Sequence, residues 1–105
     1  MKVRKKLKSI DRTRKRFSGT FEKFGIKNGH SWQETTVLLV DIRDDNDKYM
    51  TNHLWFNFTK RFQLLELSGG EKLEFDARVK KYKKGKRSKE DFKLTYPTKI
   101  EIISK

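Results

Sequence analysis

A strict alternation of apolar and charged residues is the feature of this sequence that most constrains its fold. The run puts Leu73, Phe75, Ala77 and Val79 on one side and Glu74, Asp76, Arg78 and Lys80 on the other. A period of two residues is that of a β-strand with one face buried and one face in water. The sequence therefore predicts a strand over residues 73–80 that covers a core.

A second strand is expected over residues 48–58, whose later half is dense in aromatic residues. Successive side chains of a strand point to opposite faces. The inward set is then Leu54, Phe56 and Phe58, and the outward set is His53, Trp55 and Asn57. An outward tryptophan is a candidate binding residue.

A short helix is predicted between these two strands. Thr59 can cap its start, and Phe62 and Leu65 are spaced to share one face. Gly69 and Gly70 would end it, because glycine takes the left-handed conformation at little cost.

Three further strands complete the pattern, over residues 16–27, 34–43 and 92–103. Gly19 and Gly25 fit a bulge or a sharp coil in the first of them. Asn28-Gly29 is a strong turn signal and opens the connection over residues 27–33. Residues 44–47 (DDND) lack the glycine and the terminal glutamate of a calcium loop, so we interpret them as an Asx-rich turn.

Positive charge is concentrated at two places in the sequence. The chain has 105 residues and a net charge of +13, of which residues 1–16 carry +8 and residues 79–91 carry +5. Residues 17–78 are close to neutral, at −2. Two basic blocks on a neutral body are typical of a protein that binds a polyanion, whereas solubility alone calls for interspersed charge.

Composition also narrows the class of protein. There is no cysteine, which excludes disulfides and thiolate metal sites, and no apolar run is long enough to span a membrane. A basic start without an apolar segment after it is not a signal peptide, so a cytoplasmic location is expected. We expect no metal and no cofactor, because the two histidines are not spaced as ligands.

The order of three strands, one short helix and two strands resembles the OB-fold, the oligonucleotide/oligosaccharide-binding barrel. The run LSGGEKLEFDARVKKY over residues 67–82 is similar to the start of the fourth strand in many nucleic-acid-binding OB domains. The small single-domain members found in phages and mobile elements are the most similar in size. The resemblance implies a mainly β, five-stranded Greek-key barrel over residues 16–105 with a basic loop at 80–91. It leaves residues 1–15 as a basic N-terminal arm, either helical or disordered.

In that family, ligands lie across the second and third strands, between the loop joining strands one and two and the loop joining strands four and five. The resemblance therefore implies a nucleic-acid site in which aromatic residues stack on bases and cations bind phosphates. The aromatic candidates are Trp32, Trp55 and Tyr82, with His53 beside Trp55. The cationic candidates are Lys80, Lys81, Lys83, Lys84, Lys86, Arg87, Arg12, Arg14, Lys15 and Arg16.

Three functional classes remain distinguishable. The leading one is non-catalytic binding of single-stranded DNA or RNA; duplex DNA ranks behind it because no recognition-helix pattern is present. The alternative is a protein-interaction module that docks on an acidic partner or a ribonucleoprotein, whose binding would persist in moderate salt. A small nuclease is disfavoured, since only His30 and His53 offer an imidazole base and no metal-ligand cluster accompanies them.

Overall fold

The computed structural model describes residues 4–84 and 89–105, with the backbone alone for Lys84 and Lys89. Most of the described chain is β-structure, as the alternating patterns predict. The elements in order are α1 (Lys5–Lys8), β1 (Arg14–Asn28), β2 (Gln33–Asp44), β3 (Tyr49–Asn57), α2 (Lys60–Gln63), β4 (Lys72–Lys84) and β5 (Lys89–Ser104).

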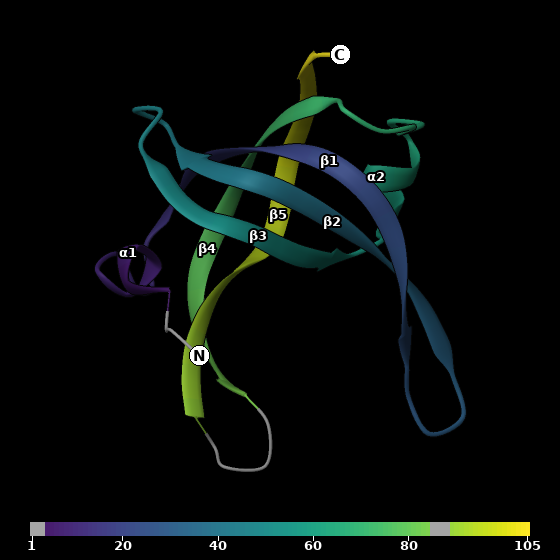
Figure 1. Ribbon diagram of the computed structural model, residues 1–105, viewed down its shortest axis with the longest axis horizontal. Helices are drawn as coiled ribbons and strands as arrows, with labels where there is room; N and C mark the ends of the chain where they lie inside the picture. The colour runs from purple at the N-terminus through teal and green to yellow at the C-terminus, as the bar shows by residue number, and fades with distance from the viewer. Residues whose placement is uncertain (1–3, 85–88) are drawn as a thin grey trace.

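The five strands form one antiparallel sheet in the order β3-β2-β1-β4-β5. β1 is central: its first half pairs with β4 and most of its length pairs with β2. The two strands at the ends of this order, β3 and β5, also contact each other. In Figure 1, β1, β2 and β3 cross over β4 and β5, so the sheet folds back on itself.

The strong curvature of β1 has a local cause. Its register with β2 shifts between Ser18 and Thr20 and again between Phe21 and Lys23. A Cβ on Gly19 would lie 2.8 Å from Cδ1 of Ile42, so only glycine lets the two strands approach this closely. The predicted bulge at Gly19 is therefore confirmed.

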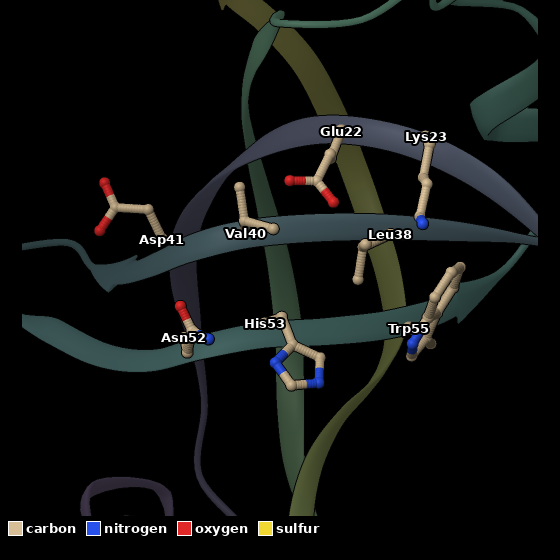
Figure 2. A pocket seen from close by; sticks show the side chains of 8 residues that line it. All are labelled: Glu22, Lys23, Leu38, Val40, Asp41, Asn52, His53 and Trp55. Atoms are coloured by element: carbon tan, nitrogen blue, oxygen red, sulfur yellow. The ribbon is translucent and has the colours of Figure 1, made fainter.

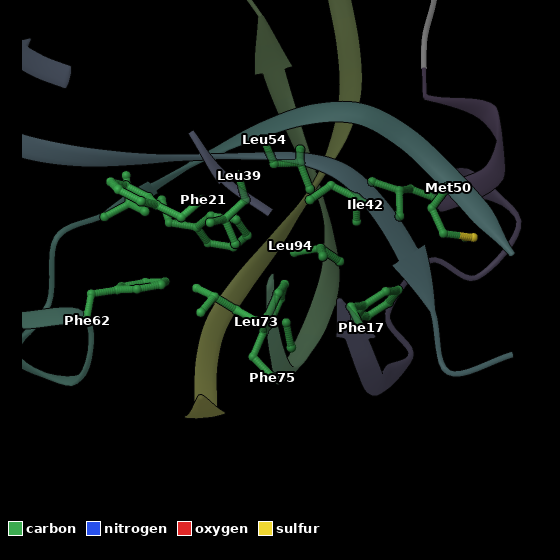
Figure 3. Close-up of a cluster of buried hydrophobic side chains, with 14 of the residues drawn as sticks. Phe17, Phe21, Leu39, Ile42, Met50, Leu54, Phe62, Leu73, Phe75 and Leu94 are labelled. Atoms are coloured by element: carbon green, nitrogen blue, oxygen red, sulfur yellow. The ribbon is translucent and has the colours of Figure 1, made fainter. Parts of the chain in front are cut away.

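The core lies between the crossing halves of the sheet, where inward-facing residues of all five strands meet (Figure 3). The predicted alternations hold: Leu54 and Phe56 are buried while His53 and Trp55 are exposed. Phe75 packs edge-on against Phe56, with ring centroids 5.6 Å apart. The buried cluster comprises Leu7, Phe17, Phe21, Val37, Leu39, Ile42, Met50, Leu54, Phe56, Phe62, Leu67, Leu73, Phe75, Ala77, Val79, Phe92 and Leu94.

The helix between β3 and β4 is shorter than the sequence predicts. It is a single turn that begins after Thr59, whose backbone oxygen, rather than its side chain, accepts the first hydrogen bonds. Phe62 is buried and Leu65 packs against the core, as their spacing predicts, whereas Leu64 is exposed. The prediction that the glycine pair ends the helix is wrong.

Gly69 and Gly70 instead belong to a turn held by a buried carboxylate. Both have positive φ, at 138° and 88°. The carboxylate of Glu71 accepts hydrogen bonds from the backbone N–H groups of Ser68 and Gly69, each at 2.7 Å, and from the Ser68 hydroxyl. Burial by itself would raise the pKa of Glu71, but these hydrogen bonds lower it below its ordinary value.

The N-terminal segment, where it is described, packs on the sheet and differs from the expected arm. Leu7 of α1 is fully buried in the core cluster. Arg4 joins three elements: its Nη1 donates to the Asp91 carboxylate at 3.0 Å and to the Tyr82 hydroxyl at 3.2 Å, and Nη2 reaches the His53 carbonyl at 3.5 Å. Residues 4–13 are therefore part of the folded domain.

β4 and β5 extend further than expected. The basic stretch predicted as a long loop, or as the tip of a hairpin, is largely hairpin: the strands pair from Lys80 with Lys93 out to Lys84 with Lys89. At the other end of β5, the register shifts near Pro97, because proline has no N–H to donate to a ladder. Across the described part of the chain, none of the helices combines the length and the apolar character needed to cross a membrane.

Candidate functional site

An exposed tryptophan lies on the outer face of β3, directly over a glycine of β1. Trp55 faces away from the core, as the alternation predicts, and its side chain is 45% exposed. A Cβ on Gly25 would come 2.6 Å from Cζ3 and 2.8 Å from Cη2 of the indole. The missing side chain at position 25 thus leaves room for the far edge of the indole, whose side chain remains open to solvent.

A shallow hollow of about 530 Å³ lies beside this ring, across β1, β2 and β3 (Figure 2). Lys23, Leu38 and Trp55 occupy one row of it, because they are cross-strand partners in register. Figure 2 shows Lys23 and the indole at one end of the hollow, Asp41 at the other end, and Glu22 between them, next to Lys23.

The other tryptophan repeats this arrangement at the tip of the β1–β2 hairpin. A Cβ on Gly29 would overlap the indole of Trp32, and the Gly29 N–H donates to the Trp32 carbonyl at 2.8 Å. Trp32 is 47% exposed. Lys23, Gly25 and Lys27 share the outer face of β1, and Gly29 follows at the same spacing, so cations and indoles alternate along a strand with a rise of about 3.4 Å per residue.

Lys27, Lys80 and Lys93, which come from three different strands, make up a lysine group. Lys80 of β4 pairs directly with Lys93 of β5. Burial, and then repulsion from Lys80 and from Lys27 of β1, lower the pKa of Lys93 below its ordinary value. In Figure 1 the β1–β2 and β4–β5 hairpins project toward the same side of the molecule.

Tyr82 lies at the edge of this lysine group and is half-buried. The Nζ of Lys93 lies 5.1 Å from the centroid of its ring, which is cation–π distance, and its hydroxyl accepts the hydrogen bond from Arg4. Lys93 therefore contacts the ring of Tyr82 and Arg4 contacts its hydroxyl, which leaves this side chain less open for stacking than Trp55 or Trp32.

Two of the N-terminal cations expected at the site are neutralised elsewhere. Arg16 contacts the carboxylates of Glu74, Asp76 and Glu101 at 3.0–3.4 Å. Burial would lower the pKa of Arg16, but its hydrogen bonds to Asp76 and Glu74 raise it. Lys15 lies 3.3 Å from Asp45, at the turn between β2 and β3. Neither cation lies among the residues that line the Trp55 hollow.

Arg12 and Arg14 lie on the outer side of β4 and β5. Arg14 pairs with Arg78 in register and donates to the carbonyl of Tyr96 and the hydroxyl of Thr98. Arg12 is exposed, with a left-handed backbone whose N–H donates to the Val79 carbonyl. These two cations join a different surface from that of Lys15 and Arg16.

The remaining cationic candidates lie on the β4–β5 hairpin. Lys81 is paired with Glu90 at 3.7 Å, and Lys83 is exposed opposite Glu90 in the ladder. Of Lys84 only the backbone is described, and Lys86 and Arg87 lie outside the described residues.

Sequence reasoning missed three cations: Lys23 and Lys27, which share the outer face of β1 with Gly25, and Lys93, which contacts the ring of Tyr82. They lie outside the two basic blocks, so a count of charge by segment passes over them. Lys23 and Lys27 could have been identified from the alternation of side chains along β1, which places both on the same face as Gly25. His53 is exposed beside Trp55 as expected and lines the hollow.

The acidic stretch at residues 44–47 forms the predicted Asx turn. Asp44 Oδ1 accepts the backbone N–H groups of Asn46 and Lys48, both at 2.9 Å. Burial would raise the pKa of Asp44, but these bonds and the nearby lysines lower it. Within residues 4–84 and 89–105, no group of three or more potential metal ligands comes together.

Comparisons with known proteins add no assignment: no family model, no curated protein and no solved structure matches this chain. The case for a function therefore depends on the residues of the site.

Proposed function

We propose that this protein is a non-catalytic nucleic-acid-binding protein with an OB-like barrel, and that it binds single-stranded DNA or RNA across β1, β2 and β3. The strand order supports the barrel, because β1 pairs with both β2 and β4 while the end strands β3 and β5 approach each other. In such a barrel, the outer face of β2 and β3 between the two hairpins is the surface used for oligonucleotides.

The observation that carries the proposal is the open indole of Trp55 on Gly25, with Lys23 and Lys27 on either side of it along β1. A base stacked on such a ring contributes about 1–3 kcal/mol with little sequence preference, since every base has a π-face. Each lysine that neutralises a phosphate releases counterions, which makes the affinity fall with salt.

The geometry favours a single strand over a duplex. A base can stack on an indole only when one of its own faces is free, whereas in a duplex the bases are paired and stacked on one another. A flexible single strand can turn a base toward Trp55 or Trp32, and a duplex resists this.

The decisive experiment compares two charge-matched double variants. Lys23→Ser with Lys27→Ser removes the cations beside the indoles, and Lys48→Ser with Lys105→Ser removes two exposed cations elsewhere. The first pair should weaken binding to oligo(dT) by about tenfold or more and flatten the salt slope by about two, one for each lysine that no longer binds a phosphate. The second pair should change both values little.

Equal effects of the two pairs would mean that only net charge matters and would remove the proposed site. Docking on an acidic protein partner, the alternative, predicts no oligonucleotide binding and a complex that persists in moderate salt.

A further inference from the structure

We call the surface of β1, β2 and β3 around Trp55, Lys23 and Lys27 the Trp55 shelf. A second cationic surface covers the outer side of β4 and β5. It is a groove of about 470 Å³ whose lining includes Arg12, Arg78, Lys80 and Tyr96. Tyr96 is 72% exposed, the second most exposed of the large apolar side chains. Its backbone is left-handed, with φ of 52°, and its carbonyl accepts a hydrogen bond from Arg14. An unburied aromatic ring beside arginines is the chemistry of another stacking position.

The charge of this surface is not cancelled. On the outer face of β4, Glu74 and Asp76 are matched by Arg16, but the next two outward residues are Arg78 and Lys80. Among the described residues, no carboxylate forms an ion pair with Arg12, Arg78 or Lys80. Asp11 is the one acidic residue that lines the groove.

The groove reaches the lysine group through Lys80. Lys80 lines the groove and pairs with Lys93, and Lys93 is repelled by Lys27, two residues along β1 from Gly25. In the Trp55 hollow, negative charge increases away from the indole: Glu22 lies next to Lys23, and Asp41 lies at the far end (Figure 2). A phosphate chain that leaves the indoles toward β4 and β5 meets further positive charge at Lys93, Lys80 and Arg78.

We infer that the single strand continues from the Trp55 shelf over Lys93 and Lys80 into the groove at Arg78 and Tyr96, where a base stacks on Tyr96. This inference rests on the proposed function and extends it, because it adds a second contact segment and a longer bound length. The occupant is the phosphate chain of the same strand.

Oligonucleotide length separates the two surfaces. An oligo(dT) of about 4 nucleotides is long enough for the shelf alone, while one of about 16 nucleotides can reach both surfaces. The test variant is Tyr96→Asn with Arg78→Ser, because asparagine tolerates the left-handed backbone at position 96. Its control is Ile103→Ser with Lys105→Ser, which removes one exposed apolar side chain and one cation at the far end of β5.

The test variant should bind the short oligonucleotide within about twofold of the unaltered protein, and the long one about tenfold or more weakly. The control should bind both normally. Unchanged binding of the long oligonucleotide by a folded test variant would overturn the second surface and leave the shelf intact. If the unaltered protein binds neither length, the proposed function itself fails.

A measurement on the unaltered protein covers the case in which the variant does not fold. Photocrosslinking with iodouracil-substituted oligonucleotides should label Tyr96 with the long probe and not with the short one. Labelling confined to Trp55 and Trp32 with both lengths would overturn the inference.

Discussion

The indole of Trp55 lies so close to Gly25 that a β-carbon at residue 25 would come 2.6 Å from its ring. Gly25 of β1 pairs with Thr36 of β2, whereas Trp55 of β3 pairs with Leu38 of β2, so the indole reaches Gly25 diagonally across β2. The glycine therefore determines how the ring lies, and the ring covers the backbone of a strand that has no side chain there. A change at position 25 reaches the proposed site without removing any group that would touch a ligand.

Replacing Gly25 with Ala should displace the Trp55 ring, because a rigid indole has no flexible end that can move aside. We expect about tenfold weaker oligo(dT) binding and a loss of about 1–3 kcal/mol in the free energy of unfolding. Fluorescence anisotropy and urea titration measure the two quantities. Ser31→Ala, in the connection of the same hairpin, is the control and should change neither. A folded Gly25→Ala variant with normal affinity would show that the ring position does not matter for binding.

Gly19 offers a test of the packing that curves β1. Its replacement by Ala would bring Cβ within 2.8 Å of Ile42 Cδ1 and 3.2 Å of Leu39 Cβ. We expect the free energy of unfolding to fall by about 1–3 kcal/mol. Ile42→Val deletes the nearer atom, so the double variant should recover part of this loss. A double-mutant cycle in urea measures the coupling, and strictly additive losses would contradict the contact.

The carboxylate of Glu71 should make stability depend on pH in the acid range. Its pKa in the folded protein is lowered, so its contribution is present above the unfolded value of 4.5 and is lost as the pH falls through the folded value. Glu71→Gln should therefore cost about 1–3 kcal/mol at neutral pH and progressively less below about pH 4.5. Urea denaturation across the acid range measures this, with exposed Glu34→Gln as the control. A loss that stays constant with pH would contradict the assignment.

Leu7 tests whether the N-terminal segment belongs to the domain. Its side chain is fully buried against the sheet, so Leu7→Ala should destabilise the protein by about 2–5 kcal/mol. Lys8→Ala, on the exposed side of the same short helix, should have little effect. Thermal unfolding distinguishes the two variants. Equal stability of both would mean that α1 behaves as a detachable arm in solution.

The strands could be predicted from the sequence because their signal is local. The alternation at residues 73–80 and 53–58 identifies the inward and outward faces, and Trp55 is exposed where the pattern puts it. The second basic block coincides with the β4–β5 hairpin. The sequence predicted a long loop there, but the two strands remain paired out to Lys84 and Lys89.

The features that the sequence did not indicate depend on which strands pair and in which register. In the sequence, Arg16 belongs to a basic block. In the ladder, however, it lies opposite Asp76 and beside Glu74, so these two carboxylates neutralise its charge. Lys93 looked isolated, yet the pairing with Lys80 places it in the cationic group. The contacts of Gly25 with Trp55 depend on the alignment of three strands, which no local pattern contains.

The most direct test of nucleic-acid binding is an anisotropy titration of the unaltered protein against labelled single-stranded DNA, single-stranded RNA and duplex DNA of equal length over a range of salt. We predict that a single strand binds more tightly than the duplex and that the logarithm of its affinity falls linearly with the logarithm of salt concentration. Equal or tighter duplex binding, or an affinity for single strands that does not change with salt, would contradict the proposed function.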